Sequence, residues 1–434
     1  MRKRLVFVFF AITFCLPATL VWSEQPEEIA STSEKSTLPL ADLRRFAEVF
    51  DRIKKAYVEP VPDKQLIEDA VRGMLTGLDP HSSYLEAKQY ADLQIQTSGQ
   101  FGGVGIEISQ DEGVIRVITA IDDTPAMGAG IKAGDLIIKI DGKVIQSIGV
   151  EKAISLMRGE AGSKIVLTIV RDEQQVPFDL TLTRAVINVT SVRSKILDES
   201  IAYLRISQFQ RHSARDLNKQ LIQLQEDGLI TGVVLDLRNN PGGVLQGAVD
   251  VTDAFVNQGI IVSTRGRLAS SQMSFNATDT MSVPDIPMIV LINGGSASAS
   301  EIVAGALQDK GRAIIMGTPS FGKGSVQTVL QLSEKRAIKL TTAKYYTPSG
   351  RSIQVKGIIP DIIVEQASVK EYSPSKVLRE KDLSGHLENP QEDPKNIVKT
   401  KLIEKDFQLY EAVNLIKGLV IVRKSNLNKL DEKG

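Results

Sequence analysis

The feature that most constrains the fold is a series of short apolar runs separated by amphipathic helical segments, between residues 201 and 317. The runs read "IAYLRIS", "GVVLDL", "PMIVLIN" and "RAIIMG", and the helical segments are 213–226, 243–256 and 299–309. Continuous apolar runs are typical of strands that are buried on both faces, whereas half-exposed strands alternate. Such strands with helices between them predict a largely parallel sheet inside an α/β domain.

Residues 101–184 carry a different pattern. The stretches "GVGIEIS" and "GVIRVITAI" alternate as strands do, and Asp141 and Gly142 fit a hairpin turn. A short helix is expected at 150–157, followed by the strand "KIVLTIVR". This pattern predicts a separate β-rich module ahead of the α/β domain.

The region before this module is predicted to be helical. One helical stripe, with spacings that alternate between three and four, carries Leu43, Phe46, Phe50, Ile53 and Tyr57. The plain interpretation is a helix that faces a core, and a two-helix dimer seam is the alternative. A second helix is expected at about 64–77.

The first residues read as an export signal. A basic start is followed by an apolar run from Leu5 to about Trp22, and small residues precede a possible cleavage point before Glu24. We therefore expect a signal peptide at 1–23, a linker at 24–39, and a location in the periplasm or cell envelope. An uncleaved membrane anchor is the alternative, and it would leave the protein membrane-associated.

Composition excludes several classes of function. The 52 basic and 52 acidic residues balance, so no general field favours nucleic acid, and we expect no nucleic-acid partner. The single cysteine, Cys15, lies in the leader, so the mature chain is expected to have no disulfide, no thiol nucleophile and no cysteine metal site. Beyond about residue 366 the chain is highly charged, and a last helix is expected at roughly 405–422.

The segment "MGTPSFGKGSVQ" comes close to a phosphate-binding loop but departs from it in two ways. Gly324 stands where a Ser or Thr would bind magnesium, and the residues that follow favour a strand and not a helix. The S-x-x-K pattern from Ser320 to Lys323 lacks its companion motifs. In an extended chain, Lys323 and Gln327 would share one face, so Gln327 could hold the lysine amine by a hydrogen bond.

Ser298 lies where a buried strand turns into a helix. With Glu301 it satisfies a capping box, so it can simply cap the helix. It can equally be a nucleophile, because amides at a helix N-terminus can receive an oxyanion. The amide of Ala299 would be one donor, and the turn at Gly242 and Gly243 could supply another, although that turn can also be an ordinary strand-to-helix connection. These residues alone leave the choice open.

A serine nucleophile needs a base. The three histidines, His81, His212 and His386, do not lie beside a serine and carboxylate set in the sequence. A lysine can replace histidine if burial keeps the amine neutral. Lys323 is therefore the candidate base, and Ser298 and Lys323 would form a Ser–Lys dyad.

Several segments together carry a family resemblance. They are "AVRGMLTGLDPHSSYL" at 70–85, "DLRNNPGG" at 236–243, "GGSASASEIVAGALQD" at 294–309, "SFGKGSVQ" at 320–327, "YYTPSGRSIQ" at 345–354 and "GIIPDI" at 357–362. Over nearly all of residues 40–365 the chain resembles the carboxyl-terminal processing (tail-specific) serine proteases of peptidase family S41. The resemblance implies Ser298 as nucleophile, Lys323 as general base, Gln327 as its orienter, and backbone amides of Ala299, Gly242 and Gly243 as the oxyanion hole.

The resemblance also implies a domain organisation. The fold class is α/β, a crotonase/ClpP-like protease core with an inserted PDZ domain and an N-terminal helical region. The boundaries implied are the helical region at 40–98, the PDZ domain at 99–185, the core at 186–366, and a charged segment with the C-terminal helix at 367–434. In the PDZ domain, residues Gly103, Val104, Gly105 and Ile106 occupy the place of a carboxylate-binding loop. Arg158 stands where related enzymes couple PDZ position to the catalytic site.

The implied activity is a serine endopeptidase that binds the C-terminal region of protein substrates through its PDZ domain and needs no cofactor or metal. A homo-oligomer, a dimer or larger, and a helical-repeat lipoprotein adaptor are the partners that the family suggests. A catalytically inactive PDZ scaffold or chaperone on the same fold is the main alternative. A histidine-dependent serine protease is a third.

Overall fold

The structure is a computed structural model. It describes residues 38–368 except 112, 173, 175, 199, 280–282 and 284, and also residues 380, 383–387 and 402–431. The expected signal peptide, most of the linker and most of the charged segment lie outside the described residues. The chain divides into two units, residues 1–68 and 69–434.

The first unit contains α1 (Leu40–Ala56) and the start of α2 (Asp63–Thr76), which confirms two helices. The apolar stripe of α1 is not buried: Phe46 and Ile53 are exposed, and no residue of the helix is buried within the chain. The expectation of a core-facing helix was therefore wrong. An amphipathic pattern identifies the apolar face of a helix but not what covers it.

The main sheet of the second unit has six strands in the order β10-β11-β12-β15-β16-β19. All neighbouring pairs are parallel except β10 with β11. The strands are β10 (Val192–Leu197), β11 (Ile201–Ile206), β12 (Gly232–Asp236), β15 (Met288–Ile292), β16 (Ile314–Gly317) and β19 (Ile362–Ile363). The four apolar runs became β11, β12, β15 and β16, which confirms the predicted parallel sheet.

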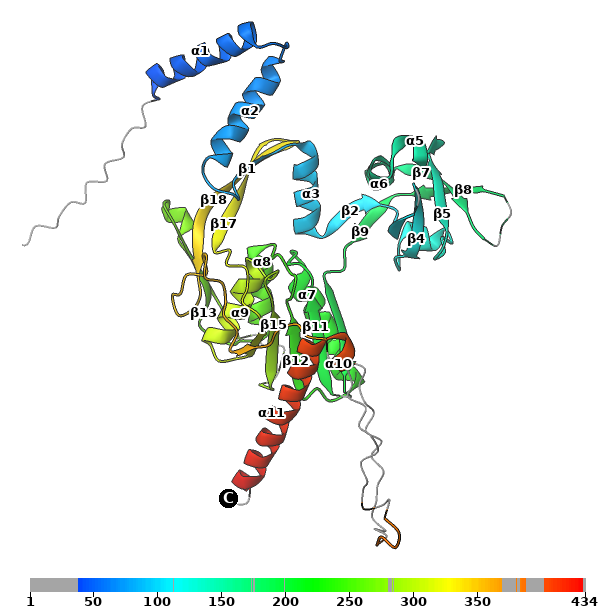
Figure 1. Cartoon of the computed structure of the whole chain (residues 1–434), viewed down its shortest axis with the longest axis vertical. Helices are drawn as coiled ribbons and strands as arrows, with labels where there is room; N and C mark the ends of the chain where they lie inside the picture. The colour runs from blue at the N-terminus through cyan, green and yellow to red at the C-terminus, as the bar shows by residue number, and fades with distance from the viewer. Residues whose placement is uncertain are drawn as a thin grey trace, which may run out of the picture. The chain divides into compact units, whose positions relative to one another are not determined.

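Helices cover both faces of this sheet (Figure 1). One face packs against α7 (Ser213–Asp227), α8 (Leu245–Asp253) and α9 (Ala299–Asp309), and the other against α11 (Phe407–Asp431). Val233 points into the first layer and Val234 into the second, and both are fully buried. Because each face is covered, both sets of alternate residues are apolar, which explains the continuous apolar runs.

A second, antiparallel sheet carries the segment that follows Lys323. It has the order β1-β18-β13-β14, with β17 also paired to β18. Its strands are β1 (Ser83–Leu85), β18 (Arg336–Tyr346), β13 (Ile260–Gly266), β14 (Met273–Asn276) and β17 (Ser325–Ser333). The extended pattern after Lys323 thus became a strand that is followed directly by its hairpin partner β18.

The β-rich module has its own core, which runs from Val104 to Leu182. Its sheet has the order β3-β4-β5-β7-β8, with β6 paired to β5. Its elements are β3 (Ile106–Asp111), β4 (Val114–Ala120), α4 (Pro125–Gly128), β5 (Leu136–Ile140), β6 (Lys143–Val144), α5 (Ile145–Ile148), α6 (Val150–Met157), β7 (Lys164–Val170) and β8 (Phe178–Thr183). The predicted turn at Asp141 and Gly142 has positive φ at both residues, as a two-residue hairpin requires.

A two-stranded ribbon joins this module to the core. It pairs β2 (Gln100–Gly103) with β9 (Ala185–Asn188), and α3 (Ala87–Ser98) leads into it. At the other end of the chain, the short α10 (Leu402–Lys405) precedes α11. None of the helices in the described part of the chain is both long enough and apolar enough to span a bilayer.

Candidate active site

A cavity of about 620 Å³ brings the predicted catalytic residues into one place. Ser298, Lys323 and Gln327 line it together with Gly242 and Gly243. They come from the turn after β12, the entry to α9, the loop between β16 and β17, and the start of β17, which contains Gln327. The carboxyl ends of parallel strands lie at one edge of a sheet, so the turn after β12 and the entry to α9 meet there.

Ser298 occupies the N-cap position of α9 with a strained backbone. Its φ of 58° and ψ of −111° are rare for a residue with a side chain. Its Oγ lies 2.8 Å from the hydroxyl of Tyr345. Burial is the main reason that the pKa of Tyr345 is raised to about 12, so this hydroxyl stays protonated at neutral pH. A strained backbone such as that of Ser298 costs stability, so strained residues persist mainly at functional sites.

The carboxylate of Glu301 ties the two halves of the site together. Glu301 is fully buried, and one oxygen accepts hydrogen bonds from the amides of Ser298 (2.7 Å) and Lys323 (2.9 Å). The other oxygen accepts from the Ser320 hydroxyl and the Gly322 amide, both at 2.6 Å. One side chain of α9 therefore fixes the backbone of the candidate nucleophile and that of the candidate base.

The loop that carries Lys323 is also held from its other side. Tyr345 donates its amide to the carbonyl of Gly324 at 2.9 Å, and Gln354 accepts the amide of Gly324 at 3.0 Å. The amide of Val355 donates to the carbonyl of Gly322 at 2.8 Å. Gly322 has a φ of 92°, and an added Cβ would lie 2.9 Å from the backbone of Val355. The loop therefore has little freedom to move relative to α9.

The environment of Lys323 favours the neutral amine. Burial is the largest effect and lowers the pKa of the amine, and the positive charge of Lys339 lowers it further. Glu301 and Asp79 act in the opposite direction, but the net pKa lies below the ordinary lysine value. In the described part of the chain, no hydrogen bond joins the Lys323 amine to Ser298, whose hydroxyl lies against Tyr345 instead.

Gln327 lines the cavity but does not contact the lysine amine by a hydrogen bond. Its amide nitrogen donates to Ser325 Oγ at 2.8 Å and to Thr341 Oγ1 at 3.5 Å. The expected alternation breaks here because β17 begins only at Ser325, and its pairing with β18 shifts between Val326 and Gln327. A role as orienter of the lysine stays a prediction.

The two glycines of the expected oxyanion hole differ in their surroundings. The Gly242 amide donates to Asn240 Oδ1 at 2.9 Å, so it is already occupied. The amides of Gly243 and Ala299 donate to no other group among the described residues. A Cβ on Gly242 would lie 2.8 Å from Ser298 Cβ, so the turn presses directly against the serine. Gly243 and Ala299 are the better donor pair.

The histidines are placed differently from one another. His81 is half-buried in the segment before β1, and burial and then the charge of Lys323 lower its pKa. His212 precedes α7 and lies 3.4 Å from Asp216, while His386 is exposed. None of the three lines the cavity that contains Ser298.

The predicted carboxylate-binding loop lies between β2 and β3. The carbonyls of Val104 and Gly105 accept hydrogen bonds from Ala126 and Ile121, both at 2.9 Å. Their amides donate to no group in the described part of the chain, as a carboxylate loop requires. Gly105 has a φ of 80°, and an added Cβ would lie 2.3 Å from Thr124, so only glycine fits. Gly103 ends β2 and Ile106 begins β3.

Arg158, predicted to be regulatory, connects the module to the rim of the cavity. It follows α6 as its C-cap, its guanidinium lies 5.4 Å from the ring of Phe101 in β2, and it forms an ion pair with Asp92 of α3 at 3.2 Å. The helix α3 contributes Tyr90 and Leu93 to the cavity lining. A physical connection from the module to the cleft therefore exists in the chain.

The chain is similar to known families and proteins. The model of peptidase family S41 matches residues 200–364, a PDZ domain model matches 116–171, and a model described as the activating protease CtpB N-terminal domain matches 9–89. A carboxy-terminal-processing protease of Bartonella bacilliformis is 46% identical over 419 residues, which is 95% of both chains. The chain belongs to peptidase family S41.

Another protein and a solved structure are also similar to this chain. A carboxyl-terminal-processing protease of Synechocystis is 36% identical, with 82% of this chain and 88% of the relative covered. A solved structure titled photosystem II D1 C-terminal processing protease is 29% identical and covers 74% of this chain and 92% of that one, with a TM-score of 0.43. This S41 protein is a carboxyl-terminal processing protease with a PDZ domain, and hence a serine-type peptidase.

The roles of two residues of the candidate site were not expected from the sequence. Glu301 was noted as a capping residue, which is correct for the Ser298 amide but omits its bonds to the lysine loop. Tyr345 had no signal of its own, because its place beside Ser298 depends on how β18 packs against α9. The segment that contains Tyr345 belongs to the family resemblance, and that was the only available indication.

Replacing Glu301 by Gln tests its role as the common anchor. Either orientation of the new amide turns an NH2 group toward two of the four donors. We expect a loss of about 3 kcal/mol in the free energy of unfolding and at least a tenfold lower kcat, because hydrogen bonds to charged groups contribute about 1.5–3 kcal/mol each. Denaturant unfolding and peptide cleavage measure the two effects. The same change at exposed Glu334 is the control, and equal behaviour of the two variants would contradict this role.

Proposed function

We propose that this S41 protease cleaves peptide bonds with a Ser–Lys dyad formed by Ser298 and Lys323. The observation that carries the proposal is that a strained serine and a lysine of lowered pKa line one cavity while a single buried carboxylate holds both backbones. Because both backbones are held, the rearrangement that the proposal requires is confined to side chains: Ser298 Oγ must turn from Tyr345 toward the Lys323 amine.

The proposed reaction follows from these groups. Ser298 Oγ attacks the scissile carbonyl carbon while Lys323 takes the hydroxyl proton, and the amides of Gly243 and Ala299 stabilise the oxyanion. The lysine then gives the proton to the leaving amine as the carbon–nitrogen bond breaks. Water, deprotonated by the same lysine, then attacks the acyl carbon, the bond from that carbon to Ser298 Oγ breaks, and the lysine returns the proton to Oγ. Tyr345 can donate a hydrogen bond to Ser298 Oγ, because its raised pKa keeps its own hydroxyl protonated.

The proposal is tested first on the nucleophile. Ser298→Ala is expected to lower the cleavage rate of an unfolded protein substrate by at least about a thousandfold. His81→Ala should keep more than a tenth of the wild-type rate, since loss of a general base costs about 100-fold or more. Equal, slow cleavage by wild type and Ser298→Ala would favour the scaffold alternative. An inactive but folded His81→Ala would favour a histidine-dependent enzyme.

The pH dependence tests the base. Only the neutral amine accepts a proton, so kcat/KM should rise with pH through the pKa of Lys323, below the ordinary value of about 10.4. The charge of Lys339 disfavours protonated Lys323, so Lys339→Gln raises this pKa and should move the rising limb about half a unit or more to higher pH. Exposed Lys335→Gln is the control. A limb that does not move in Lys339→Gln would exclude Lys323 as the titrating group.

We also propose that the PDZ domain captures the substrate's C-terminus. The free amides of Val104 and Gly105 would bind the terminal carboxylate, while the chain adds as a strand beside β3. A substrate peptide with an amidated C-terminus should show a KM raised about tenfold, because charge-assisted hydrogen bonds are lost. The same peptide acetylated at its N-terminus is the control. Unchanged kinetics for the amidated peptide would remove the PDZ domain from substrate selection.

The location and assembly of the protein are proposals from its sequence. The basic, apolar leader supports export to the cell envelope. The exposed apolar face of α1 supports a homo-oligomer, and a helical-repeat lipoprotein adaptor remains a proposal from the family alone. Cell fractionation tests export to the envelope, and light scattering of the purified chain tests the homo-oligomer.

A further inference from the structure

The guanidinium of Arg238 joins the end of β12 to the C-terminal segment. It bonds both oxygens of Asp406, at 2.8 and 2.7 Å, and both oxygens of Asp236, at 3.0 and 2.7 Å. It also donates to Gln408 Oε1 at 3.0 Å. The Arg238 side chain is only 10% exposed. A buried cation therefore depends on two carboxylates that lie 170 positions apart in the sequence (Asp236 to Asp406).

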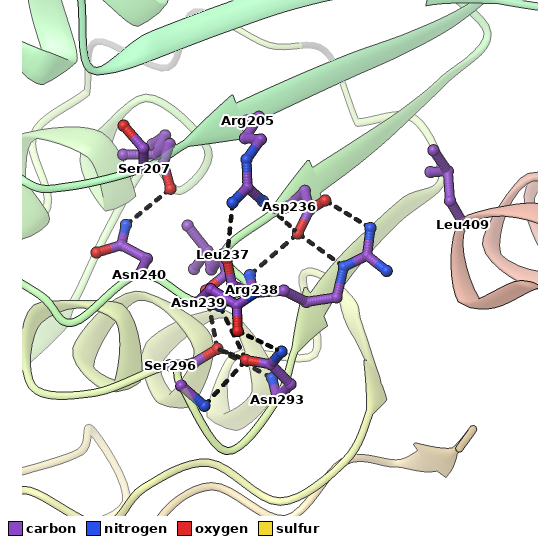
Figure 2. A network of polar contacts seen from close by, with 12 residues as sticks. Arg205, Ser207, Asp236, Leu237, Arg238, Asn239, Asn240, Asn293, Ser296 and Leu409 are labelled. Carbon is purple, nitrogen blue, oxygen red and sulfur yellow. Dashed lines mark hydrogen bonds and ion pairs between the residues drawn. The ribbon is translucent and has the colours of Figure 1, made fainter. Parts of the chain in front are cut away.

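Arg238 is also the first residue of the turn that approaches Ser298. Its amide donates to Asp236 Oδ1 at 3.0 Å, and its carbonyl accepts from Arg205 at 3.1 Å, so side chain and backbone are held in one network (Figure 2). The next residue, Asn239, has a φ of 55° and exchanges two hydrogen bonds with Asn293, at 2.8 and 2.9 Å. In Figure 2, Arg238, Asn239 and Asn293 lie close together just beyond the strand that contains Asp236.

The turn then continues to the candidate oxyanion donors. Asn240 is fully buried; its side chain binds the carbonyl of Ile206 and the amide of Gly242, and its carbonyl accepts from Ser300 at 2.9 Å. A Cβ on Gly242 would lie 2.9 Å from the Ala299 amide nitrogen. A displacement of Arg238 would therefore be passed through two bonded residues to Gly242 and Gly243, which line the cavity together with Ser298.

The C-terminal segment supplies three of the five oxygens that accept hydrogen bonds from the Arg238 guanidinium in the described part of the chain. Asp406 immediately precedes α11, and Gln408 in its first turn also donates to the carbonyl of Val364 at 2.7 Å. Apolar residues of α11, including Leu409 and Ile416, are buried against the sheet. Hydrogen bonds from Arg238 hold the pKa of Asp406 below its ordinary value, although burial alone would raise it. Docking of α11 and the position of Arg238 are thus linked.

We propose that the C-terminal segment 402–431 is a positioning element of the catalytic site, with Asp406 acting through Arg238 on the turn 239–243. Asp406 touches no part of the catalytic cavity, so its role is to position other groups. This inference rests on the proposed catalytic site, because it assigns the oxyanion donors to Gly243 and Ala299. Without the Asp406 carboxylate the guanidinium keeps its two bonds to Asp236 but loses its second bidentate partner, and the turn is less well ordered when the oxyanion forms.

The test compares two ion pairs of the same segment. Asp406→Asn removes the charge at the carboxyl end of the parallel strands. Lys417→Ala removes the ion pair of α11 with Asp198, which precedes β11 and so lies at the opposite end of those strands. We expect Asp406→Asn to lower kcat about tenfold with KM within about twofold of wild type, since one oxyanion donor alone can contribute about 100-fold. Lys417→Ala should leave both constants within about twofold.

Two further variants separate positioning from simple anchoring. Asp406→Glu keeps the charge and should recover kcat to within about threefold of wild type. In a double-mutant cycle, Asp406→Asn should cost little once Arg238→Lys has removed the bidentate pair, because the two residues act as one unit. Melting temperatures of all variants are measured alongside, and kinetics are recorded well below the lowest of them.

The outcomes are distinguishable. A lower melting temperature with unchanged kcat in Asp406→Asn would make Asp406 a structural anchor only and overturn the inference. Equal loss in Asp406→Asn and Lys417→Ala, or full additivity with Arg238→Lys, would also overturn it. Cleavage by Ser298→Ala at the wild-type rate would instead overturn the proposed function. An inactive Ser298→Ala together with a fully active Asp406→Asn would overturn the inference but leave the proposed function intact.

Discussion

The acceptance of four hydrogen bonds by the buried carboxylate of Glu301 is the interaction on which the site depends. Two of its donors belong to the segment around Lys323, one is the Ser320 hydroxyl, and one is the amide of Ser298. A buried charge is tolerated only when its bonds are satisfied, so this arrangement has few alternatives. The side chain therefore determines the relative position of α9 and the lysine loop before any substrate is present.

The parallel sheet provides the second constraint. It places the turn after β12 beside the entry to α9, and its two buried faces hold both connections on a rigid layer. The antiparallel sheet adds Tyr345, whose amide holds the lysine loop and whose hydroxyl contacts Ser298. Backbone contacts thus hold the candidate catalytic residues, which come from distant parts of the chain, around one cavity.

Much of the fold could be predicted from the sequence because local patterns determine it. Four continuous apolar runs became β11, β12, β15 and β16, and the hairpin turn at Asp141 formed as its residues require. The helix α1 and its apolar stripe were predicted correctly, but the stripe is not buried as expected, because an apolar face does not determine what covers it. The hydrogen bonds of Gln327 also differ from the expected pair with Lys323, because β17 starts two residues later than the lysine and its register shifts.

The sequence by itself determined which residues carry reactive groups, the order of strands and helices, and the family, because these depend on residue type and short spacings. The tertiary structure alone decided which groups meet. It set the hydroxyl of Tyr345 against Ser298, occupied the amide of Gly242 with Asn240, and joined Arg238 to Asp406. Such contacts depend on how separate elements pack, and packing is settled by three-dimensional distances that no local spacing in the chain encodes.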